Sequence, residues 1–507
     1  MPRLTVPPNF TGTAGSDTLV GQDLNKFPAI GIDILTGGFI VTASGKDTIK
    51  GNGTGGKGRD GAGAIGKNVN GSEGGAGIGI SNNGNLNAGS GDDAIISNGI
   101  GGLGGNGGNE SESDSTVGGS GGAGTGISNI GILNTGLGND TIIGNGTSGN
   151  GGSGGSSYAW GGNGGFGTGI SNSGKLNTGL GNDTITGTGQ GGAGYGNHYG
   201  GNGGFGTGIS NSGQLDTGDG KDTITGIGIA GIPGSGLLIG RGGLGTGISN
   251  NGSLNTGDGN DTITGTGKGT RSDFFFGGGI GTGITNSKKL DTGDGNDIII
   301  GTGTDTGTDT GGLLNEDNSR GTGIENIKGA TITTGQGNDT ITGTGKISGA
   351  NSTAYGIFND GVIDTGNGCD ILTGQATATI GGTAYGIYGK GTIKTSDGND
   401  KITSTSTIDG VLQKVTIGGG INIDLDVGND YFKGFGTGTV DGGKGFDTLD
   451  LSAFNRSQLT FSGVISGNAL NPANISFNNN KNVITLSTTG FENFIFADSS
   501  LYYSTLV

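Results

Sequence analysis

The chain has 507 residues, of which 131 are glycine and only 28% are apolar, and its formal net charge is -17. This charge excludes nucleic acid and anionic membrane as electrostatic partners, because both require an excess of Lys and Arg. With a single Cys (Cys369) and a single His (His198), the chain has no internal disulfide. A zinc site of His and Cys, or a Cys/His or Ser/His catalytic pair, is equally hard to assemble.

The N-terminal segment, residues 1–50, leads into the first repeat. It begins MPRLTVPPNF and has no basic region followed by a long apolar stretch, so it predicts no conventional signal peptide. Its prolines Pro2, Pro7 and Pro8 favour an extended arm over a lid on the first coil. No stretch of the sequence approaches the ~18 apolar residues of a membrane-spanning helix, so we expect no membrane insertion.

A phrase such as LNTGDGNDTITGTG, residues 254–267, recurs along most of the chain. The full repeat unit is 30 residues where it is shortest, as between Asp370 and Asp400. Between residues 51 and 330 the units are longer, because they carry Gly-rich insertions such as GGSGGSSYAWGGNGG, residues 151–165. These insertions are either flexible linkers or packed extended chains in which backbone approaches backbone. Residues 331–435 return to compact units of about 30 residues.

Apolar residues occupy three places in each unit: the Ile of TGISN, the Leu or Ile of LNTG, and the residue two after the repeated aspartate. Each alternates with small or polar residues, which is the pattern of a strand with one buried face. One unit has too few apolar groups to fold alone, so the units must stack. The sequence therefore predicts an all-β fold, a parallel β-solenoid of the β-helix or β-roll kind. We expect about a dozen three-strand coils with Gly-rich loop insertions and a C-terminal β cap.

A row of asparagines lies two residues after the first apolar position. By strand alternation these side chains point inward, where each amide would bond to its neighbour along the axis. The alternative is that Asn serves only as a turn residue that tolerates positive φ. Either interpretation places a corner of the coil here. The row consists of Asn82, Asn129, Asn172, Asn211, Asn250, Asn286, Asn326 and Asn359.

The phrases TGDGKDTIT and TGDGNDTIT resemble the G-G-x-G-x-D-x-U-x nonapeptide of the RTX, or hemolysin-type, calcium-binding repeats. The resemblance implies that a glycine turn presents carbonyl groups and that the aspartate reaches a Ca2+ ion between successive turns. The implied metal ligands are Asp93, Asp140, Asp183, Asp222, Asp261, Asp297, Asp339, Asp370, Asp400, Asp430 and Asp447. The same alignment also includes Asp17 and Asp47.

The chain departs from the RTX pattern in two ways. It carries one nonapeptide per coil instead of two, and Thr usually replaces the first glycine of the pair. Only one corner of the coil would then form a calcium column. The alternative is that each aspartate caps local backbone N–H groups without any metal.

The C-terminal region, residues 436–507, loses the Gly-rich texture and gains phenylalanine. Its stretches GGKGFDTLDLSAFN, residues 442–455, and ISFNNNKNVITLSTTGFENFIFAD, residues 475–498, are similar to the C-terminal regions of RTX proteins exported by type I secretion. The alternative, which is compatible with the first, is a β cap that closes the open edge of the solenoid. The resemblance predicts a secreted protein, located outside the cell or at its surface.

No HExxH or GxSxG motif and no added catalytic region accompany the repeats, so we expect no enzyme. The first hypothesis is an extracellular fibre, sheath or surface-layer subunit, similar to the repeat-rich surface and matrix proteins of cyanobacteria, that self-associates into filaments and has cell-surface polysaccharide as a further partner. The second is a ligand-binding solenoid, either an adhesin or an ice-binding protein. It depends on outward Thr-x-Thr rows such as Thr184 and Thr186, which are similar to those of ice-binding solenoids but are interrupted by Ile298, Ile371 and Lys401.

Overall fold

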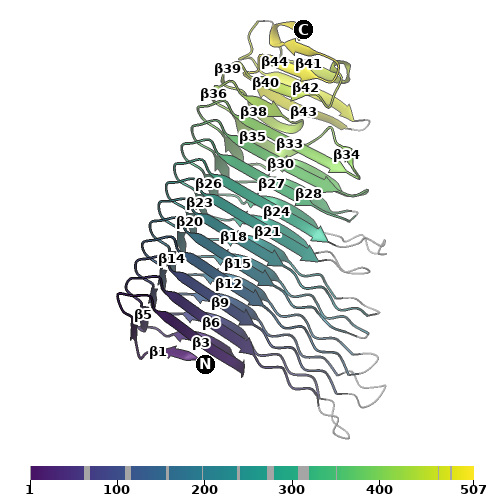
Figure 1. Ribbon diagram of the computed structural model, residues 1–507. Helices are drawn as coiled ribbons and strands as arrows, with labels where there is room; N and C mark the ends of the chain where they lie inside the picture. Colours follow the sequence, from purple (N-terminus) through teal and green to yellow (C-terminus); the bar gives the residue numbers. More distant parts are fainter. Residues whose placement is uncertain are drawn as a thin grey trace.

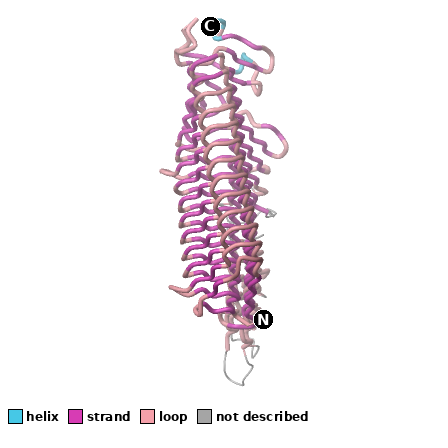
Figure 2. The backbone as a smooth tube through the Cα atoms, turned by 60° about the vertical axis from the view of Figure 1, so that its left-hand side comes forward, coloured by secondary structure: helices cyan, strands magenta, loops and turns pink. Residues whose placement is uncertain are grey.

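The chain folds into one long parallel β-solenoid, as the sequence predicts. The structure is a computed structural model, and it describes residues 2–61, 69–108, 116–155, 159–196, 198–236, 240–270, 279–306, 319–349, 351–465, 467–479 and 482–506. Figure 1 shows the strands stacked in sequence order from the purple N-terminal end to the yellow C-terminal end, and Figure 2 shows the coils as a narrow column. The described residues contain no helix that is long and apolar enough to cross a bilayer.

Each coil contributes three strands, and each strand pairs in parallel with its counterpart in the next coil. The first strands are β1 Leu4–Val6, β4 Ala29–Ile34, β7 Gly77–Asn82, β10 Gly124–Asn129, β13 Gly167–Asn172, β16 Gly206–Asn211, β19 Gly245–Asn250, β22 Ile280–Asn286, β25 Arg320–Asn326, β28 Thr353–Asn359, β31 Thr383–Tyr388, β35 Ile417–Asp424 and β38 Gly436–Asp441. The short second strands are β2 Phe10–Thr11, β5 Phe39–Val41, β8 Asn85–Asn87, β11 Ile132–Asn134, β14 Lys175–Asn177, β17 Gln214–Asp216, β20 Ser253–Asn255, β23 Lys289–Asp291, β26 Thr331–Thr333, β29 Val362–Asp364 and β32 Thr392–Lys394. The last of these, β32, pairs with the end of β35, which therefore serves as both first and second strand of its coil. Two further short strands, β36 Val427–Gly428 and β39 Lys444–Gly445, pair with each other in a separate sheet at the corner that follows.

The third strands form a separate sheet along the rod. They are β3 Thr18–Lys26, β6 Thr48–Gly55, β9 Ala94–Ile100, β12 Thr141–Thr147, β15 Thr184–Gln190, β18 Thr223–Ile229, β21 Thr262–Thr270, β24 Ile298–Thr306, β27 Thr340–Lys346, β30 Ile371–Ala378, β33 Lys401–Ile408, β37 Tyr431–Lys433, β40 Thr448–Leu451 and β44 Asn493–Phe496. A short strand, β34 Val411–Leu412, pairs with β33.

The core is a set of aliphatic ladders, one from each of the three predicted positions. Ile170, Leu176 and Ile185 of one coil are all fully buried, and each lies in register with an aliphatic residue of the next coil. Beyond these ladders the coil narrows, because the second half of the third strand packs directly on the first strand. A Cβ on Gly187 would lie only 2.4 Å from the carbonyl oxygen of Gly208. The alternating glycines are therefore needed for this close approach of backbones.

The Gly-rich insertions continue this narrow region as a packed slab, which we call the glycine fin. The fin has two layers: in one the chain runs outward from the third strand of a coil, and in the other, the returning layer, it leads back to the first strand of the next coil. Its described parts are residues 56–61, 69–76, 101–108, 116–123, 148–155, 159–166, 191–196, 198–205, 230–236 and 240–244. Most of it follows a three-residue period, with two buried positions followed by a more exposed one. This is the period of the polyproline II helix. The packed-chain interpretation of the insertions is thus confirmed for the described residues.

The backbone N–H groups of a Gly-Gly-x triplet in the fin have different acceptors. The first donates to the neighbouring chain in the same layer and the second to the opposite layer, and the third donates to an Asn or Asp side chain where the preceding coil carries one at this position. In one triplet these bonds run from Gly104 to the Asn150 carbonyl, from Gly105 to the Ser72 carbonyl, and from Asn106 to the Asp60 carboxylate. This accounting explains why an insertion almost without apolar side chains is ordered.

The two ends of the rod differ. At the N-terminus, β1 and β2 pair with β4 and β5, so residues 4–11 form part of the first coil. The predicted extended arm is therefore wrong, because Val6 is fully buried in the core. At the C-terminus, antiparallel strands follow the last coil: β41 Leu459–Ser462, β42 Ala473–Asn479, β43 Asn482–Thr489 and β45 Ser500–Tyr502, with the short helices η1 Arg456–Gln458 and η2 Tyr503–Thr505.

Candidate functional site

The repeated aspartate lies at the corner between the second and third strands. In the loop that contains Asp222, Gly218 and Gly220 have φ values of 79° and 151°. Both glycines face the corresponding loop of the previous coil, and a Cβ on Gly220 would lie 1.7 Å from the carbonyl oxygen of Gly181. The G-x-G spacing thus permits both the backbone conformation and the close stacking of successive corners. The aspartate that follows is fully buried.

One carboxylate oxygen of each corner aspartate accepts a hydrogen bond from the previous coil. The amide of Asp183 donates to Oδ1 of Asp222 at 2.7 Å, and the amide of Asp222 donates to Oδ1 of Asp261 at 2.8 Å. The same bond repeats from Asp17 to Asp447 with lengths of 2.6–2.8 Å. The row ends at Glu492, whose Oε2 accepts the Asp447 amide. We call this series of side chains the aspartate row.

The second carboxylate oxygen has no hydrogen-bond partner. Oδ2 is buried and unpartnered in Asp47, Asp93, Asp140, Asp183, Asp222, Asp261, Asp297, Asp339, Asp370, Asp400, Asp430 and Asp447. Burying an ionised oxygen without a partner is costly, so each corner requires either a proton or a cation.

Burial changes the acidity of the row accordingly. Desolvation raises the pKa to about 7 at Asp93, Asp222, Asp297, Asp370, Asp430 and Asp447. It raises the pKa to about 6 at Asp261 and Asp400. It also raises the pKa of Asp140, Asp183 and Asp339. Hydrogen bonds to the carboxylates oppose this effect but do not cancel it.

A row of buried threonines accompanies the aspartates. The hydroxyl of Thr178 donates to the Thr217 carbonyl at 3.1 Å, and that of Thr217 donates to the Thr256 carbonyl at 3.2 Å. The nearby Thr217 side chain also lowers the pKa of the Asp222 carboxyl, against the larger effect of burial. A protonated Oδ2 can therefore donate to a threonine hydroxyl whose own hydrogen is already used. Sequence reasoning missed this row, although its Thr belongs to the repeated phrase.

The donor set also suits a hard cation. Carboxylate and carbonyl oxygens are the ligands that Ca2+ prefers, and the corner offers both. The carbonyl oxygen of Gly220 and Oδ1 of Asp261 both lie beside Gly259. Among the described residues, no group of three or more His, Cys, Asp and Glu side chains is placed to hold a metal. A cation here would therefore depend on aspartates of successive coils and on backbone carbonyls.

The structure brings all eleven predicted ligands into one row. It also shows that each carboxylate caps the amide of the neighbouring coil, where local capping was the alternative considered from sequence. The metal assignment itself stays a prediction. Asp47 and Glu492 extend the row beyond the predicted set. Asp47 was visible in the alignment, whereas Glu492 lies in a segment without the glycine turn, so no sequence signal marked it.

The outer face of the third-strand sheet is a second candidate surface, which we call the threonine face. From β9 to β30, three outward columns hold no charged residue. In β15 these positions are Thr184, Thr186 and Thr188, and they pair in register with Thr223, Thr225 and Ile227 of β18. The interruptions by Ile298 and Ile371 replace hydroxyls by methyl groups without adding charge.

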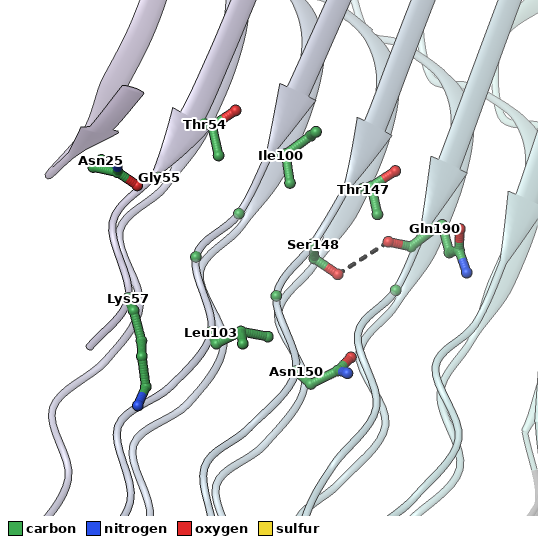
Figure 3. Close-up of a pocket in the computed structure, with 14 residues that line it drawn as sticks. Asn25, Thr54, Gly55, Lys57, Ile100, Leu103, Thr147, Ser148, Asn150 and Gln190 are labelled. Atoms are coloured by element: carbon green, nitrogen blue, oxygen red, sulfur yellow. Dashed lines mark hydrogen bonds between the residues drawn. The ribbon is translucent and has the colours of Figure 1, made fainter. Parts of the chain in front are cut away.

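A shallow groove of about 450 Å³ lies where the threonine face meets the fin (Figure 3). Thr54, Ile100, Thr147 and Gln190 line it along four successive coils, and the rest of its wall is largely glycine backbone. The Ser148 hydroxyl donates to the Gln190 carbonyl at 3.0 Å. The groove offers few side chains that would fix the orientation of a ligand.

Comparisons with known proteins do not assign the chain to a family. No family model and no curated protein matches the chain. Among solved structures, it is similar to a hyperactive, Ca2+-dependent, beta-helical antifreeze protein from an Antarctic bacterium. The identity is 16%, the match covers 97% of this chain and 94% of that chain, and the TM-score is 0.32.

Proposed function

We propose that this chain is a secreted structural solenoid whose corners are rigidified by calcium. The observation that supports this is the continuous series of buried, unpartnered Oδ2 atoms in the aspartate row. A Ca2+ ion shared between successive corners would compensate these oxygens and remove the repulsion between stacked carboxylates. The ligands would be Asp93 to Asp447 of the predicted set, together with carbonyl oxygens of the turn glycines.

The structural role follows from the shape and connectivity of the rod. Hydrogen-bonded ladders run through a sheet of 27 strands and another of 16 strands, so the molecule resists bending and stretching along its length. We infer self-association along the axis, because the outer edges of β1, β2 and β3 have no further strand to pair with within the described chain. Docking of this edge on the C-terminal region of a second copy would repeat without closing and give a filament. Type I export would place such filaments outside the cell.

Calcium binding is tested first, on the full-length protein. Elemental analysis after equilibration with millimolar calcium should find bound calcium, and EGTA should lower the melting temperature. Binding of a ligand to the native state alone at 100 times its Kd contributes about 2.7 kcal/mol. If the melting temperature is unchanged and no calcium is bound, the calcium proposal is wrong and the aspartate row is compensated by protons alone.

Filament formation is tested separately, by electron microscopy in calcium. Leu24 lies on β3 and its side chain is 49% exposed. Leu24→Lys should abolish filaments by charging the N-terminal edge, whereas Leu35→Lys, on a turn of the second coil, should not. If the unaltered protein stays monomeric in calcium, the fibre proposal is wrong even if calcium binds.

A second function is supported by the threonine face. Its outward residues repeat about every 4.8 Å along the axis and about every 6.7 Å along each strand. Such a flat, uncharged array of hydroxyl and methyl groups fits a regular surface such as ice. Thermal hysteresis measurements test this. Thr225→Lys, at the centre of the threonine face, should abolish thermal hysteresis. The control Ser210→Lys, on the face formed by the first strands, should leave thermal hysteresis unchanged. No thermal hysteresis in the unaltered protein would reject this function.

A further inference from the structure

The glycine fin carries an unusual group of exposed aromatic residues on its returning layer. Trp160 is 52% exposed, Phe166 is 56% exposed and Phe205 is 43% exposed, and Tyr199 is half-buried beside them. Phe166 and Phe205 occupy the outward positions of Gly-Gly-x triplets, and Trp160 and Tyr199 lie at the equivalent outward positions six residues earlier. Trp160 is also the sole Trp of the chain. Exposed aromatic groups that gather on one layer of a Gly-rich surface indicate a candidate binding site.

Backbone hydrogen bonds fix these side chains in rows. The amide of Gly161 donates to the Tyr199 carbonyl at 2.8 Å, which aligns Trp160 with Tyr199. The amide of Gly167 donates to the Phe205 carbonyl at 2.9 Å, which aligns Phe166 with Phe205. Between these two aromatic rows lies a row of amides, Asn163 and Asn202. The aromatic rows are six residues apart, about 19 Å for a polyproline II chain.

The rings stand away from the fin with their faces directed along the solenoid axis. The centroids of Trp160 and Tyr199 are 4.5 Å apart with an interplanar angle of 16°, and those of Phe166 and Phe205 are 5.0 Å apart at 30°. Coplanar rings lying flat side by side cannot approach so closely, so the rings must stack face to face from coil to coil. Within the described residues, each stack therefore ends at its first member, Trp160 or Phe166, with no third ring against the outer face.

The outer face of the first ring in each stack is directed toward the preceding coil, where the aligned side chains are smaller. In the preceding coil, the residues aligned with Trp160, Asn163 and Phe166 are Val117, Ser120 and Ala123. None of these three is aromatic, so in the described part of the fin no third ring covers the near faces of Trp160 and Phe166. We call this step, bounded by Trp160, Asn163 and Phe166, the aromatic shelf.

We propose that the aromatic shelf binds a neutral polysaccharide chain that runs across the fin. The apolar C–H face of a sugar ring would extend each aromatic stack by one member, above Val117 and above Ala123. The Asn163 carboxamide accepts the Asn202 amide through Oδ1 at 2.7 Å, which leaves its NH2 group for sugar hydroxyls between the two stacks. The spacing of the stacks requires an oligosaccharide several sugars long, so single sugars bind weakly.

The charge of the surface selects among occupants. The shelf and the step below it consist of uncharged residues, although the chain has a net charge of -17. A neutral glycan is not repelled by this excess of carboxylates, whereas an acidic polymer is. Stacking faces combined with amide donors also fit a sugar chain better than a purely apolar partner.

Trp160 makes the test specific, because fluorescence of the full-length protein reports on the shelf alone. Dextran and cello-, xylo- and agaro-oligosaccharides serve as neutral probes and alginate as the acidic one. We expect at least one neutral probe to change Trp160 fluorescence saturably, with longer oligosaccharides binding more tightly. Phe166→Ser should weaken this binding about three- to tenfold. The matched control, Phe446→Ser, alters an exposed Phe of the C-terminal region and should leave binding unchanged.

Four results would contradict the proposal. The first is no saturable change with any neutral probe, and the second is equal binding by Phe166→Ser when its melting curve matches that of the control. The third is a dimer, detected by sedimentation, that forms at Trp160 in the unaltered protein and dissociates in the Phe166→Ser variant. A second copy of the chain would then be the occupant of the aromatic shelf. Alginate binding as tightly as the best neutral probe would likewise refute selection by charge.

Discussion

Replacing Asp222 by Asn separates the two ways of compensating the aspartate row. Burial raises the pKa of Asp222 from 3.8 to about 7. The charged form is therefore disfavoured in the folded state by about 4 kcal/mol at pH above 7. In metal-free protein this site contributes no penalty below pH 4, an increasing one between pH 4 and 7, and a constant one above. Asp222→Asn keeps the side-chain oxygen that accepts the Asp183 amide. It replaces the second oxygen by an NH2 group, which can donate to the Thr217 hydroxyl.

Urea unfolding followed by circular dichroism provides the measurement. Without calcium, Asp222→Asn should be more stable than the unaltered protein at pH 8, by up to about 4 kcal/mol, and equal to it at pH 4. In saturating calcium at pH 8 the order should reverse, because the variant loses a ligand shared by two neighbouring sites. Asp219→Asn, at an exposed position of the same loop, is the control and should change little in either condition. A variant that is less stable at pH 8 without calcium would refute the assignment of a buried, uncompensated charge.

Four further predictions follow from the packing. Metal-free unaltered protein should lose stability as pH rises from 4 to 7, by about 1.4 kcal/mol per pH unit for each proton released, as measured by urea melts across that range. Asn172→Ala should cost about 1–3 kcal/mol in the same assay, because it leaves the Asn129 amide without its acceptor. Ile185→Ala should cost about 2–5 kcal/mol by opening a cavity in a fully buried ladder. Gly204→Ala should disrupt the fin locally, because its Cβ would lie 1.8 Å from the Gly165 carbonyl oxygen, and hydrogen exchange of the Gly231 amide, which donates to Gly204, should accelerate.

The coil itself was predictable because its apolar positions are few and regular. Ile170, Leu176 and Ile185 could be assigned to three strands by alternation alone, and all three are buried. The asparagine row was assigned to a corner with two interpretations open. The structure shows the inward ladder, in which the Asn172 amide donates to Asn211 at 2.8 Å and also to the Gln214 carbonyl at 2.8 Å.

The fin and the use of each carboxylate oxygen could not be predicted in the same way. Glycine has no side chain whose pattern reveals burial, so a Gly-Gly-x run reads equally as a linker or as a packed slab. The aspartate was identifiable as a corner residue, but its bonding partner is an amide 39 residues earlier in the case of Asp222. Such a bond depends on the length of the intervening insertion, which varies from coil to coil. The arm expected at the N-terminus failed because strand pairing of residues 4–6 with β4 outweighs the turn preference of Pro7 and Pro8.

The composition explains why the polar rows matter more here than in an ordinary domain. Each coil buries three principal aliphatic side chains, and the fin buries mainly backbone, so hydrophobic stabilisation per residue is small. Order must then come from the many hydrogen bonds that successive coils exchange, and a single unpaired group is repeated at every coil. In a stack where each coil contacts only its neighbours, such a repeated defect weakens every interface by a similar amount. The unpartnered Oδ2 is a defect of this kind, which is why its compensation by calcium or by a proton should determine the stiffness of the whole rod.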